Sequence, residues 1–298
     1  MSRMSRIAAV GISSFAWLAA GANAGAPATS LNTSNGYNLP VGVSELSQEI
    51  HSVHMIAFWV CVVIAVAVFG AMIVALLKFR HSQGAVPDTT MVHSTKAEII
   101  WTVIPVVILV FMAVPAAETL IKIEDARNSE LSIRVTGYQW KWQYQYMDAG
   151  EGVSFFSTLS QDSNEARQLG SGIDPRTVPD YLLSVDHPMV IPSGAKVRLL
   201  LTSQDVIHAW WVPDLGMKRD AIPGFINELW IKVPVGKEGT YRGQCAELCG
   251  QDHGFMPIVV EVKTPDEFKK WVEEQKAQAK QAAAPQAEPV KTAQVLNR

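Results

Sequence analysis

The chain has 298 residues, of which 48% are hydrophobic and 18% charged, and its formal net charge at pH 7 is -3. This hydrophobic share is high for a soluble protein and low for a polytopic transporter, so it predicts a few membrane spans joined to a substantial water-facing domain. The small net charge, together with the lack of a concentrated Lys/Arg patch with interleaved aromatics, argues against nucleic-acid binding.

Residues 1–24 have the features of a secretory signal peptide. Arg3 and Arg6 precede an apolar core at residues 7–20, and residues 22–24 are the small-residue sequence Ala-Asn-Ala that is typical of a cleavage site. A third membrane helix is the alternative interpretation, but the core is shorter than the ~20 residues that a span requires. We therefore expect this segment to be removed on export.

Two later apolar stretches are long enough to cross a bilayer. We expect transmembrane helices at residues 55–77 and 99–121, joined by a loop at residues 78–98. The second stretch contains Pro105 and Pro115, which are tolerated in a membrane helix where neighbouring helices satisfy the freed carbonyls. The sequence thus indicates a two-helix hairpin that packs against a partner protein.

Flanking charges predict the orientation of this hairpin. Lys78, Arg80 and Lys96 lie in the connecting loop, whereas the segment at residues 25–54 contains neither Lys nor Arg. Because positive residues accumulate on the cytoplasmic side, the loop is placed in the cytoplasm and both mature termini on the outer side.

From about residue 130 the hydrophobic residues alternate with polar ones, which is the period of a β-strand. The alternation is clear at residues 131–135, 197–201, 229–233 and 258–262, with turns rich in Gly and Pro between them. Several short strands separated in this way predict an all-β, antiparallel sandwich or barrel.

The phase of the alternation changes at Gly137. Five aromatic residues then recur at every second position, and we expect them to share one face of a strand. They are Tyr138, Trp140, Trp142, Tyr144 and Tyr146. A glycine at a phase change predicts a bulge or a bend.

The remaining segments are more polar. Residues 157–179 are rich in Gly, Ser and Asp, which predicts a long surface loop. Residues 264–267, Thr-Pro-Asp-Glu, form a helix-start pattern, so a short helix is expected to run to about Gln278. The Ala/Gln/Lys/Pro-rich residues 273–298 have no apolar periodicity and are assigned to a disordered C-terminal tail.

Potential metal ligands are concentrated near the end of the β-rich region. Cys245, Cys249, His253 and Met256 fall within a dozen residues between two predicted strands, and His208 lies earlier in the chain. Thiolate and thioether are soft ligands that select copper, and imidazole also suits it. Two thiolates can bridge two copper ions, so the pattern favours a binuclear centre. A disulfide is the alternative in an exported protein, and zinc is another, although Met is a poor zinc ligand.

Several blocks of the sequence resemble subunit II of bacterial cytochrome c oxidase, a haem–copper oxidase. The matching blocks are residues 139–146, 208–213, 216–224 and 243–256, in the family's order and behind a two-span anchor. The resemblance implies a cupredoxin-like sandwich at residues 122–272. It also implies a bacterial inner-membrane protein whose copper domain and mature termini lie on the periplasmic side.

The resemblance further implies a dinuclear copper centre, CuA. Its implied ligands are the side chains of His208, Cys245, Cys249, His253 and Met256 and the backbone carbonyl of Glu247. The Glu247 side chain is expected to point away from copper and to bind Mg²⁺ shared with subunit I. A solvated loop carboxylate is the alternative for this side chain.

Two further residues match positions with roles in the family. Trp140 matches an exposed tryptophan at which electrons arrive from cytochrome c, and the alternative is ordinary sheet core. Glu98 matches a glutamate at the entrance of a proton path into subunit I, and the alternative is a plain interface charge. The implied partners are cytochrome c, oxidase subunits I and III, and membrane lipid.

Acidic residues are implied to dock basic cytochrome c, because complementary charge speeds encounter. The matching positions are Asp186 and Asp205. The sequence departs from the family at Gln145, where many members carry a carboxylate, and the nearby Asp148 and Glu151 are expected to compensate. The alternative for each acid is an ordinary surface charge.

Two rival functions fit parts of the pattern. A membrane-tethered copper chaperone resembling thioredoxin would share the Cys-x-x-x-Cys spacing, but it does not account for two spans or for His253 and Met256. The quinol-oxidase counterpart would be a copper-free subunit, but all the ligands are present here. The favoured function is to accept electrons from cytochrome c at CuA and to pass them to haem in subunit I, where O₂ is reduced to water with proton pumping.

Overall fold

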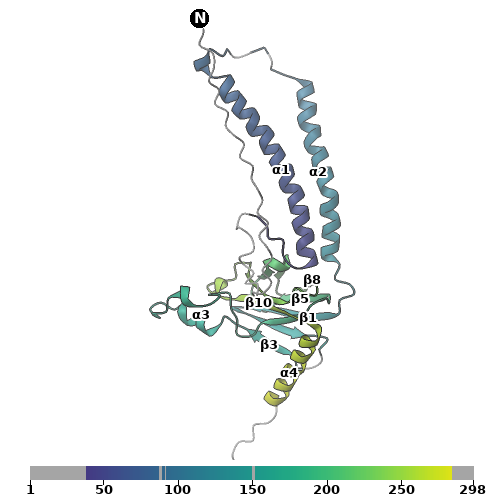
Figure 1. Ribbon diagram of the computed structural model, residues 1–298, viewed down its shortest axis with the longest axis vertical. Helices are drawn as coiled ribbons and strands as arrows, with labels where there is room; N and C mark the ends of the chain where they lie inside the picture. The colour runs from purple at the N-terminus through teal and green to yellow at the C-terminus, as the bar shows by residue number, and fades with distance from the viewer. Residues whose placement is uncertain (1–37, 87–88, 91, 150–151, 284–298) are drawn as a thin grey trace, which may run out of the picture.

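A computed structural model describes residues 38–86, 89–90, 92–149 and 152–283, and Figure 1 shows its two parts. Two long helices, α1 (Glu45–Lys78) and α2 (Thr95–Glu124), form a hairpin that stands on one end of a β-sandwich. The predicted signal peptide lies outside the described residues.

The two helices are the membrane hairpin that the sequence predicts. Both are long and apolar enough to span a membrane, and their apolar stretches are not buried against the rest of the described chain. They contain 34 and 30 residues, which at ~1.5 Å per residue exceeds the ~30 Å of a hydrocarbon core. The helices therefore continue past the predicted spans 55–77 and 99–121, and Ser44 and Ser94 cap their starts by accepting hydrogen bonds from the backbone N–H groups of Ser47 and Ala97.

Hydrogen bonds and an ion pair join the sandwich to the start of α1 and to the end of α2. At the start of α1, the Ser44 hydroxyl donates to the carbonyl of Leu215 at 2.8 Å. At the end of α2, the Trp230 indole donates to the carbonyl of Lys122 at 3.0 Å. An ion pair of 2.7 Å also joins Arg219 to Glu124. These contacts bind the β-domain directly to the membrane helices.

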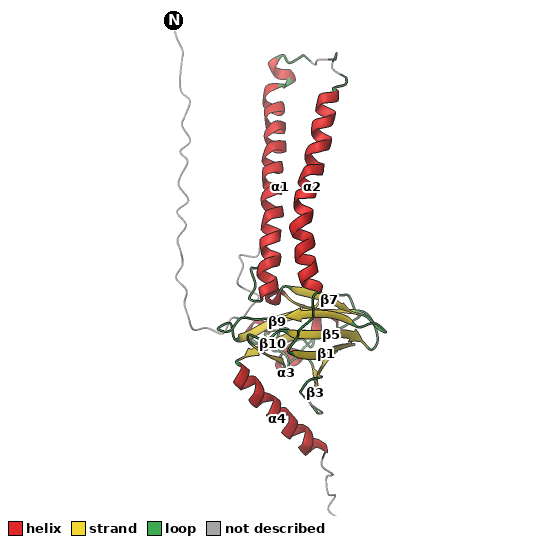
Figure 2. Ribbon diagram, turned by 90° about the vertical axis from the view of Figure 1, so that its right-hand side faces the viewer, coloured by secondary structure: helices red, strands yellow, loops and turns green. Residues whose placement is uncertain are grey.

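The β-domain consists of two five-stranded sheets (Figure 2). The first has the order β3-β2-β1-β5-β8, with strands at Ser154–Ser157 (β3), Lys141–Tyr146 (β2), Leu131–Tyr138 (β1), Val197–Ser203 (β5) and Asn227–Ile231 (β8). The second has the order β4-β10-β9-β6-β7, with strands at Met189–Pro192 (β4), Pro257–Lys263 (β10), Gly239–Cys245 (β9), His208–Val212 (β6) and Met217–Ala221 (β7). The prediction of an all-β, cupredoxin-like sandwich behind a two-helix hairpin is confirmed. The prediction that it is antiparallel is wrong, because β1 pairs with β5 and β10 pairs with β4 in parallel.

The core lies between the two sheets, where the alternating side chains of both meet. Its largest members include Trp142, Tyr144 and Tyr146 from β2 and Trp210 from β6, each with 2% or less of its surface exposed. Burial of such rings removes a large apolar area from water, which is the main force that holds the two sheets together.

The prediction that the five aromatic residues share one strand face is wrong, and of the bulge or bend expected at Gly137, no bulge is present. The register pairs Tyr138 with Lys141 and Gly137 with Trp142, so the chain reverses between β1 and β2 with no extra residue in the ladder. Tyr138 therefore belongs to β1, and Trp140 lies in the turn rather than on the buried face. The phase change in the sequence reflects this reversal of the chain.

Two predictions about the polar segments also need correction. The predicted loop at residues 157–179 contains a short helix, α3 (Gln161–Ala166), and a 3-10 turn at Pro175–Thr177. The predicted disordered tail is helical up to residue 283, because α4 (Pro265–Ala283) continues beyond Gln278. Its later turns are rich in Ala, Gln, Lys and Glu, which favour helix even without a periodic apolar face. Residues 284–298 lie outside the described chain.

The Tyr146 hydroxyl joins the two sheets. It donates to the carbonyl of Val190 in β4 at 2.7 Å and accepts from the N–H of the same residue at 2.8 Å. Tyr146→Phe leaves both buried backbone groups without this partner, so we expect the free energy of unfolding to fall by roughly 1–3 kcal/mol. Thermal unfolding of the whole chain in detergent, followed by tryptophan fluorescence, measures this.

Tyr138→Phe is the matched control for this change. The Tyr138 hydroxyl is only partly buried and donates to Gln143 at 3.1 Å, so its loss should be nearly neutral. Equal melting temperatures for the two variants would contradict the role given to Tyr146.

Candidate metal centre

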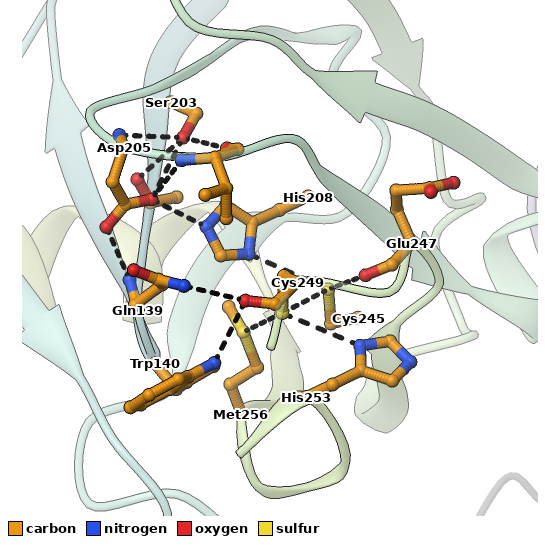
Figure 3. Close-up of polar contacts among 12 residues, drawn as sticks. Gln139, Trp140, Ser203, Asp205, His208, Cys245, Glu247, Cys249, His253 and Met256 are labelled. Carbon is orange, nitrogen blue, oxygen red and sulfur yellow. Dashed lines mark hydrogen bonds and ion pairs between the residues drawn. The ribbon is translucent and has the colours of Figure 1, made fainter. Parts of the chain in front are cut away.

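Two segments far apart in the sequence supply the potential ligands. His208 is the first residue of β6, and Cys245 is the last residue of β9. The loop that follows Cys245 contains Cys249 and His253 and reaches Met256 immediately before β10. Because β6, β9 and β10 belong to one sheet, the loop is held at both ends, and its side chains converge with His208 in Figure 3.

The distances among these side chains are short enough for one metal centre. The sulfurs of Cys245 and Cys249 are 3.8 Å apart. Nδ1 of His208 is 3.9 Å from the Cys245 sulfur, whereas Nδ1 of His253 and the sulfur of Met256 are each 3.6 Å from the Cys249 sulfur. All five predicted side chains are therefore brought together.

The backbone carbonyl of Glu247 faces the site, whereas its side-chain carboxylate faces the surface. Its carbonyl oxygen lies 3.3 Å from the Cys245 sulfur and accepts a hydrogen bond from that thiol. Its carboxylate points away from the sulfurs (Figure 3), and the residue is exposed. The adjacent Leu248 has 78% of its surface exposed.

The sulfur separation fits a shared metal ion better than a disulfide. A disulfide requires about 2.05 Å between the sulfurs, and both cysteines are free thiols in this structure. Two sulfurs bound at about 2.3 Å to the same ion with tetrahedral angles lie about 3.8 Å apart. The thioether of Met256 at 3.6 Å from Cys249 favours copper over zinc, because copper takes soft sulfur ligands of both kinds.

The two thiols differ in how readily they ionise. Burial opposes ionisation of Cys245, but hydrogen bonds from His208 and from backbone groups outweigh it and lower the pKa of this thiol to about 7. Burial, and next the charge of Cys245, raise the pKa of Cys249 to about 12. The second thiolate therefore needs the positive charge of a bound cation, as expected of a metal site rather than of a reactive thiol pair.

The turn between β1 and β2 lies against the ligand loop. The Trp140 indole N–H donates to the carbonyl of Cys249 at 3.2 Å, and the Gln139 amide donates to the same oxygen at 2.9 Å. Trp140 is partly exposed, so its ring connects the surface of the domain to the backbone of a potential ligand. Sheet core, the alternative for Trp140, does not describe this position.

Gly137 gives His208 the space it occupies. A Cβ atom at Gly137 would lie 2.7 Å from Cδ2 of the His208 ring and 3.1 Å from its Cγ. The glycine is visible in the sequence, but the pattern there predicts a bulge or a bend, because nothing local indicates that a residue 71 positions away packs against it.

Arg167 is a contact residue that sequence reasoning missed. It pairs with Asp252 at 3.4 Å and lies over the ring of Phe255 at 4.3 Å from the centroid. Both partners belong to the loop that carries His253. The segment predicted as a plain surface loop therefore packs against the ligand loop from outside.

Asp205 lies 3.0 Å from Nε2 of His208, whereas the predicted residues Asp186, Asp148 and Glu98 make their contacts elsewhere. Asp186 accepts hydrogen bonds from the backbone and hydroxyl of Thr158, and Asp148 accepts one from the backbone of Ser132. Glu98 lies in the first turn of α2, at the end of the hairpin far from the sandwich.

Glu98 is 2.9 Å from His93. Glu151 lies outside the described residues.

Comparison with known proteins identifies the same family in both halves of the chain. A family model described as the periplasmic domain of cytochrome c oxidase subunit II matches residues 131–263, and one described as its transmembrane domain matches residues 32–118.

Individual relatives cover most of the chain. It is 41% identical over 231 residues to the protein named "Probable cytochrome c oxidase subunit 2" from Rickettsia bellii, which covers 77% of this chain and 80% of that protein. It is 36% identical over 236 residues to cytochrome c oxidase subunit 2 of Arabidopsis thaliana, with 77% and 85% covered. A crystal structure of the periplasmic domain of subunit II of the Bradyrhizobium japonicum cytochrome oxidase is 42% identical, with a TM-score of 0.44, and covers 52% of this chain and 99% of that one.

Gly137→Ala tests the packing of His208. The added methyl group must displace the imidazole or the strand, and overpacking of this kind costs about 1–3 kcal/mol. We expect the variant to retain less copper after desalting and to show an altered visible spectrum of the copper-loaded protein.

Gly254→Ala is the control, because it lies in the ligand loop but has no atom within 4 Å of the added Cβ. A wild-type spectrum and copper content in Gly137→Ala would show that the imidazole does not depend on this glycine.

Proposed function

This chain belongs to the cytochrome c oxidase subunit II family, and from that premise we propose that it accepts electrons from cytochrome c at a pair of copper ions. It passes them to haem in subunit I, where O₂ is reduced to water with proton pumping. The observation that carries the proposal is the convergence of two cysteine sulfurs, 3.8 Å apart, with two imidazoles and a thioether.

The proposed copper ligands are the residues that surround these sulfurs. They are the side chains of His208, Cys245, Cys249, His253 and Met256 and the carbonyl of Glu247. When bound, copper supplies a carrier for one electron at a time. The protein keeps water out and the ligands in place, because most of these side chains are buried and the loop is held between β9 and β10. Little rearrangement is then needed for each electron.

We assign the arrival of electrons to Trp140. Its partly exposed indole donates to the carbonyl of Cys249, so a single hydrogen bond separates the surface ring from a proposed ligand. Cytochrome c is basic, and the acids Asp186, Asp148 and Glu151 are proposed to attract it.

The opposite side of the ligand loop suits contact with subunit I. Three apolar residues there or on the adjacent β7–β8 turn, Leu248, Phe225 and Ile226, have between 63% and 78% of their surface exposed. The bridge between Ser203 and Pro223 places that turn beside the end of β5, close to the site. Burial of these side chains against a partner is favourable, and the exposed carboxylate of Glu247, which precedes Leu248 in the chain, is proposed to bind Mg²⁺ at the contact.

The membrane hairpin completes the proposal. The chain is an inner-membrane protein with two spans, and we propose that membrane lipid and subunits I and III surround its helices. The sandwich lies on the periplasmic side of a bacterial inner membrane, so Glu98 at the opposite end faces the cytoplasm. There it is placed to admit protons to a path in subunit I.

The two rival functions have less support. A copper chaperone with a thioredoxin-like fold does not match the two five-stranded sheets. A copper-free subunit does not account for the convergence of all five donor side chains in one buried place.

Trp140→Phe tests the arrival of electrons. It removes the indole N–H that contacts Cys249 but no metal donor, so the copper spectrum should be unchanged. Reduction by cytochrome c should slow by about tenfold, which corresponds to about 1.4 kcal/mol in the barrier. Stopped-flow mixing with reduced cytochrome c measures the rate.

Trp211→Phe is the matched control, because Trp211 is also an exposed tryptophan, on β6, with 38% of its surface exposed. Equal rates for Trp140→Phe and the wild type would remove the role assigned to Trp140.

Glu247→Ala tests the magnesium assignment. The carbonyl that faces copper is retained, whereas the exposed carboxylate is lost. Elemental analysis of the purified complex should show a loss of magnesium with copper unchanged, and the exposed Glu228 on β8, changed to Ala, provides a charge-matched control. Full retention of magnesium in Glu247→Ala would reject the assignment.

A further inference from the structure

We infer that Asp205 is a positioning residue whose single carboxylate orients the His208 imidazole and, at the same time, fixes the turn that carries Trp140. The inference rests on the proposed function, because it concerns how the copper ligand and the electron-accepting ring are held relative to each other. The family resemblance implies that Asp205 is a docking acid, whereas in the structure its carboxylate contacts His208 and the backbone of Gln139.

Both oxygens of the Asp205 carboxylate are used inside the protein. Oδ1 is 3.0 Å from Nε2 of His208 and also accepts from the backbone N–H of Val206 at 2.7 Å and from the Ser203 hydroxyl at 3.4 Å. Oδ2 accepts from the backbone N–H of Gln139 at 2.7 Å. The side chain is 30% exposed, and both of its oxygens already have partners within the protein.

The contact with His208 decides which ring nitrogen faces the metal. His208 is fully buried, and its Nδ1 faces the Cys245 sulfur while Nε2 faces Asp205. A carboxylate on one imidazole nitrogen holds the proton there and leaves the lone pair of the other nitrogen for the metal. The carboxylate also makes the imidazole a stronger electron-pair donor to a bound metal, which would stabilise the oxidised state of that metal.

The contact with Gln139 holds the turn that carries Trp140. The turn is held by three hydrogen bonds, one from the Gln139 backbone to Asp205 and two from the Gln139 amide and the Trp140 indole to the carbonyl of Cys249. Figure 3 shows Asp205 between Gln139 and His208, and it shows Gln139 and Trp140 both bonded to the carbonyl of Cys249. Displacement of Asp205 therefore loosens both a ligand and the ring that contacts the next ligand.

Asn at this position cannot replace the carboxylate. The groups on His208 and Gln139 that face Asp205 are both N–H donors, and an amide offers one oxygen and one NH₂ group. One of the two contacts must therefore be lost. Asp205→Glu keeps the charge but moves the two acceptors by one methylene, so it separates charge from geometry.

The experiment uses the full chain in detergent, loaded with copper salts. The reduction potential and the visible spectrum of the centre are measured by spectroelectrochemistry, and reduction by cytochrome c is measured over a range of cytochrome c concentration and salt. We expect Asp205→Asn to raise the reduction potential, to alter the spectrum and to slow electron transfer at saturating cytochrome c. Copper affinity should fall by about tenfold, as for other residues that support metal ligands.

Two further variants make the test selective. Asp162→Asn, on the exposed face of α3, removes the same charge and should keep the wild-type potential and spectrum. Asp205→Glu should shift both, although its charge is unchanged. If Asp205→Asn keeps the wild-type potential and spectrum and only weakens cytochrome c binding in a salt-dependent way, Asp205 is a docking acid and the inference is wrong.

Failure of the proposed function gives a different result. A wild-type chain that binds no copper pair overturns the function itself and the inference with it. A wild-type chain with a copper pair whose potential does not respond to either Asp205 variant overturns the inference alone.

Discussion

Two cysteine sulfurs held 3.8 Å apart in a buried place would repel each other strongly if both were thiolates without a metal. Burial, and next the charge of Cys245, raise the pKa of Cys249 to about 12, whereas the pKa of Cys245 is lowered to about 7. The sandwich has to keep the pair in place against the repulsion, and strands anchor both ends of the loop. A bound cation would offset this repulsion, and the remaining donors around the pair are those that copper prefers.

Several residues around the two cysteines hold the proposed ligands in place. Gly137 leaves room for one imidazole, Asp205 orients it, and Arg167 holds the other side of the ligand loop through Asp252. The same supports reach the surface through Trp140. The bonds between the sandwich and the two helices, such as Ser44 to Leu215 and Trp230 to Lys122, fix the domain on the membrane hairpin. The proposed path of electrons thus runs through a connected set of contacts.

The ligands could be predicted from the sequence because four of them are close together and chemically distinctive, and because strands bracket them. The supports could not, because they depend on contacts between distant segments. Gly137 and His208 meet only after two sheets have formed. Trp140 was placed on a strand face because its turn, Gln139–Trp140, lacks the Asn-Gly or Asp-Gly pattern that usually reveals a hairpin. The contact of Asp205 with His208 had a usable signal in the sequence, since the two residues are three positions apart, but the family resemblance implies only a docking role for this acid.

Electron paramagnetic resonance of the full chain, loaded with copper in detergent, tests the central claim most directly. The account predicts a hyperfine pattern from one unpaired electron shared over two equivalent copper nuclei. That pattern should survive Cys61→Ser, since Cys61 is exposed on α1, and should disappear in Cys249→Ser. A spectrum from a single copper in the wild-type chain, or a two-copper pattern that persists without Cys249, would contradict it.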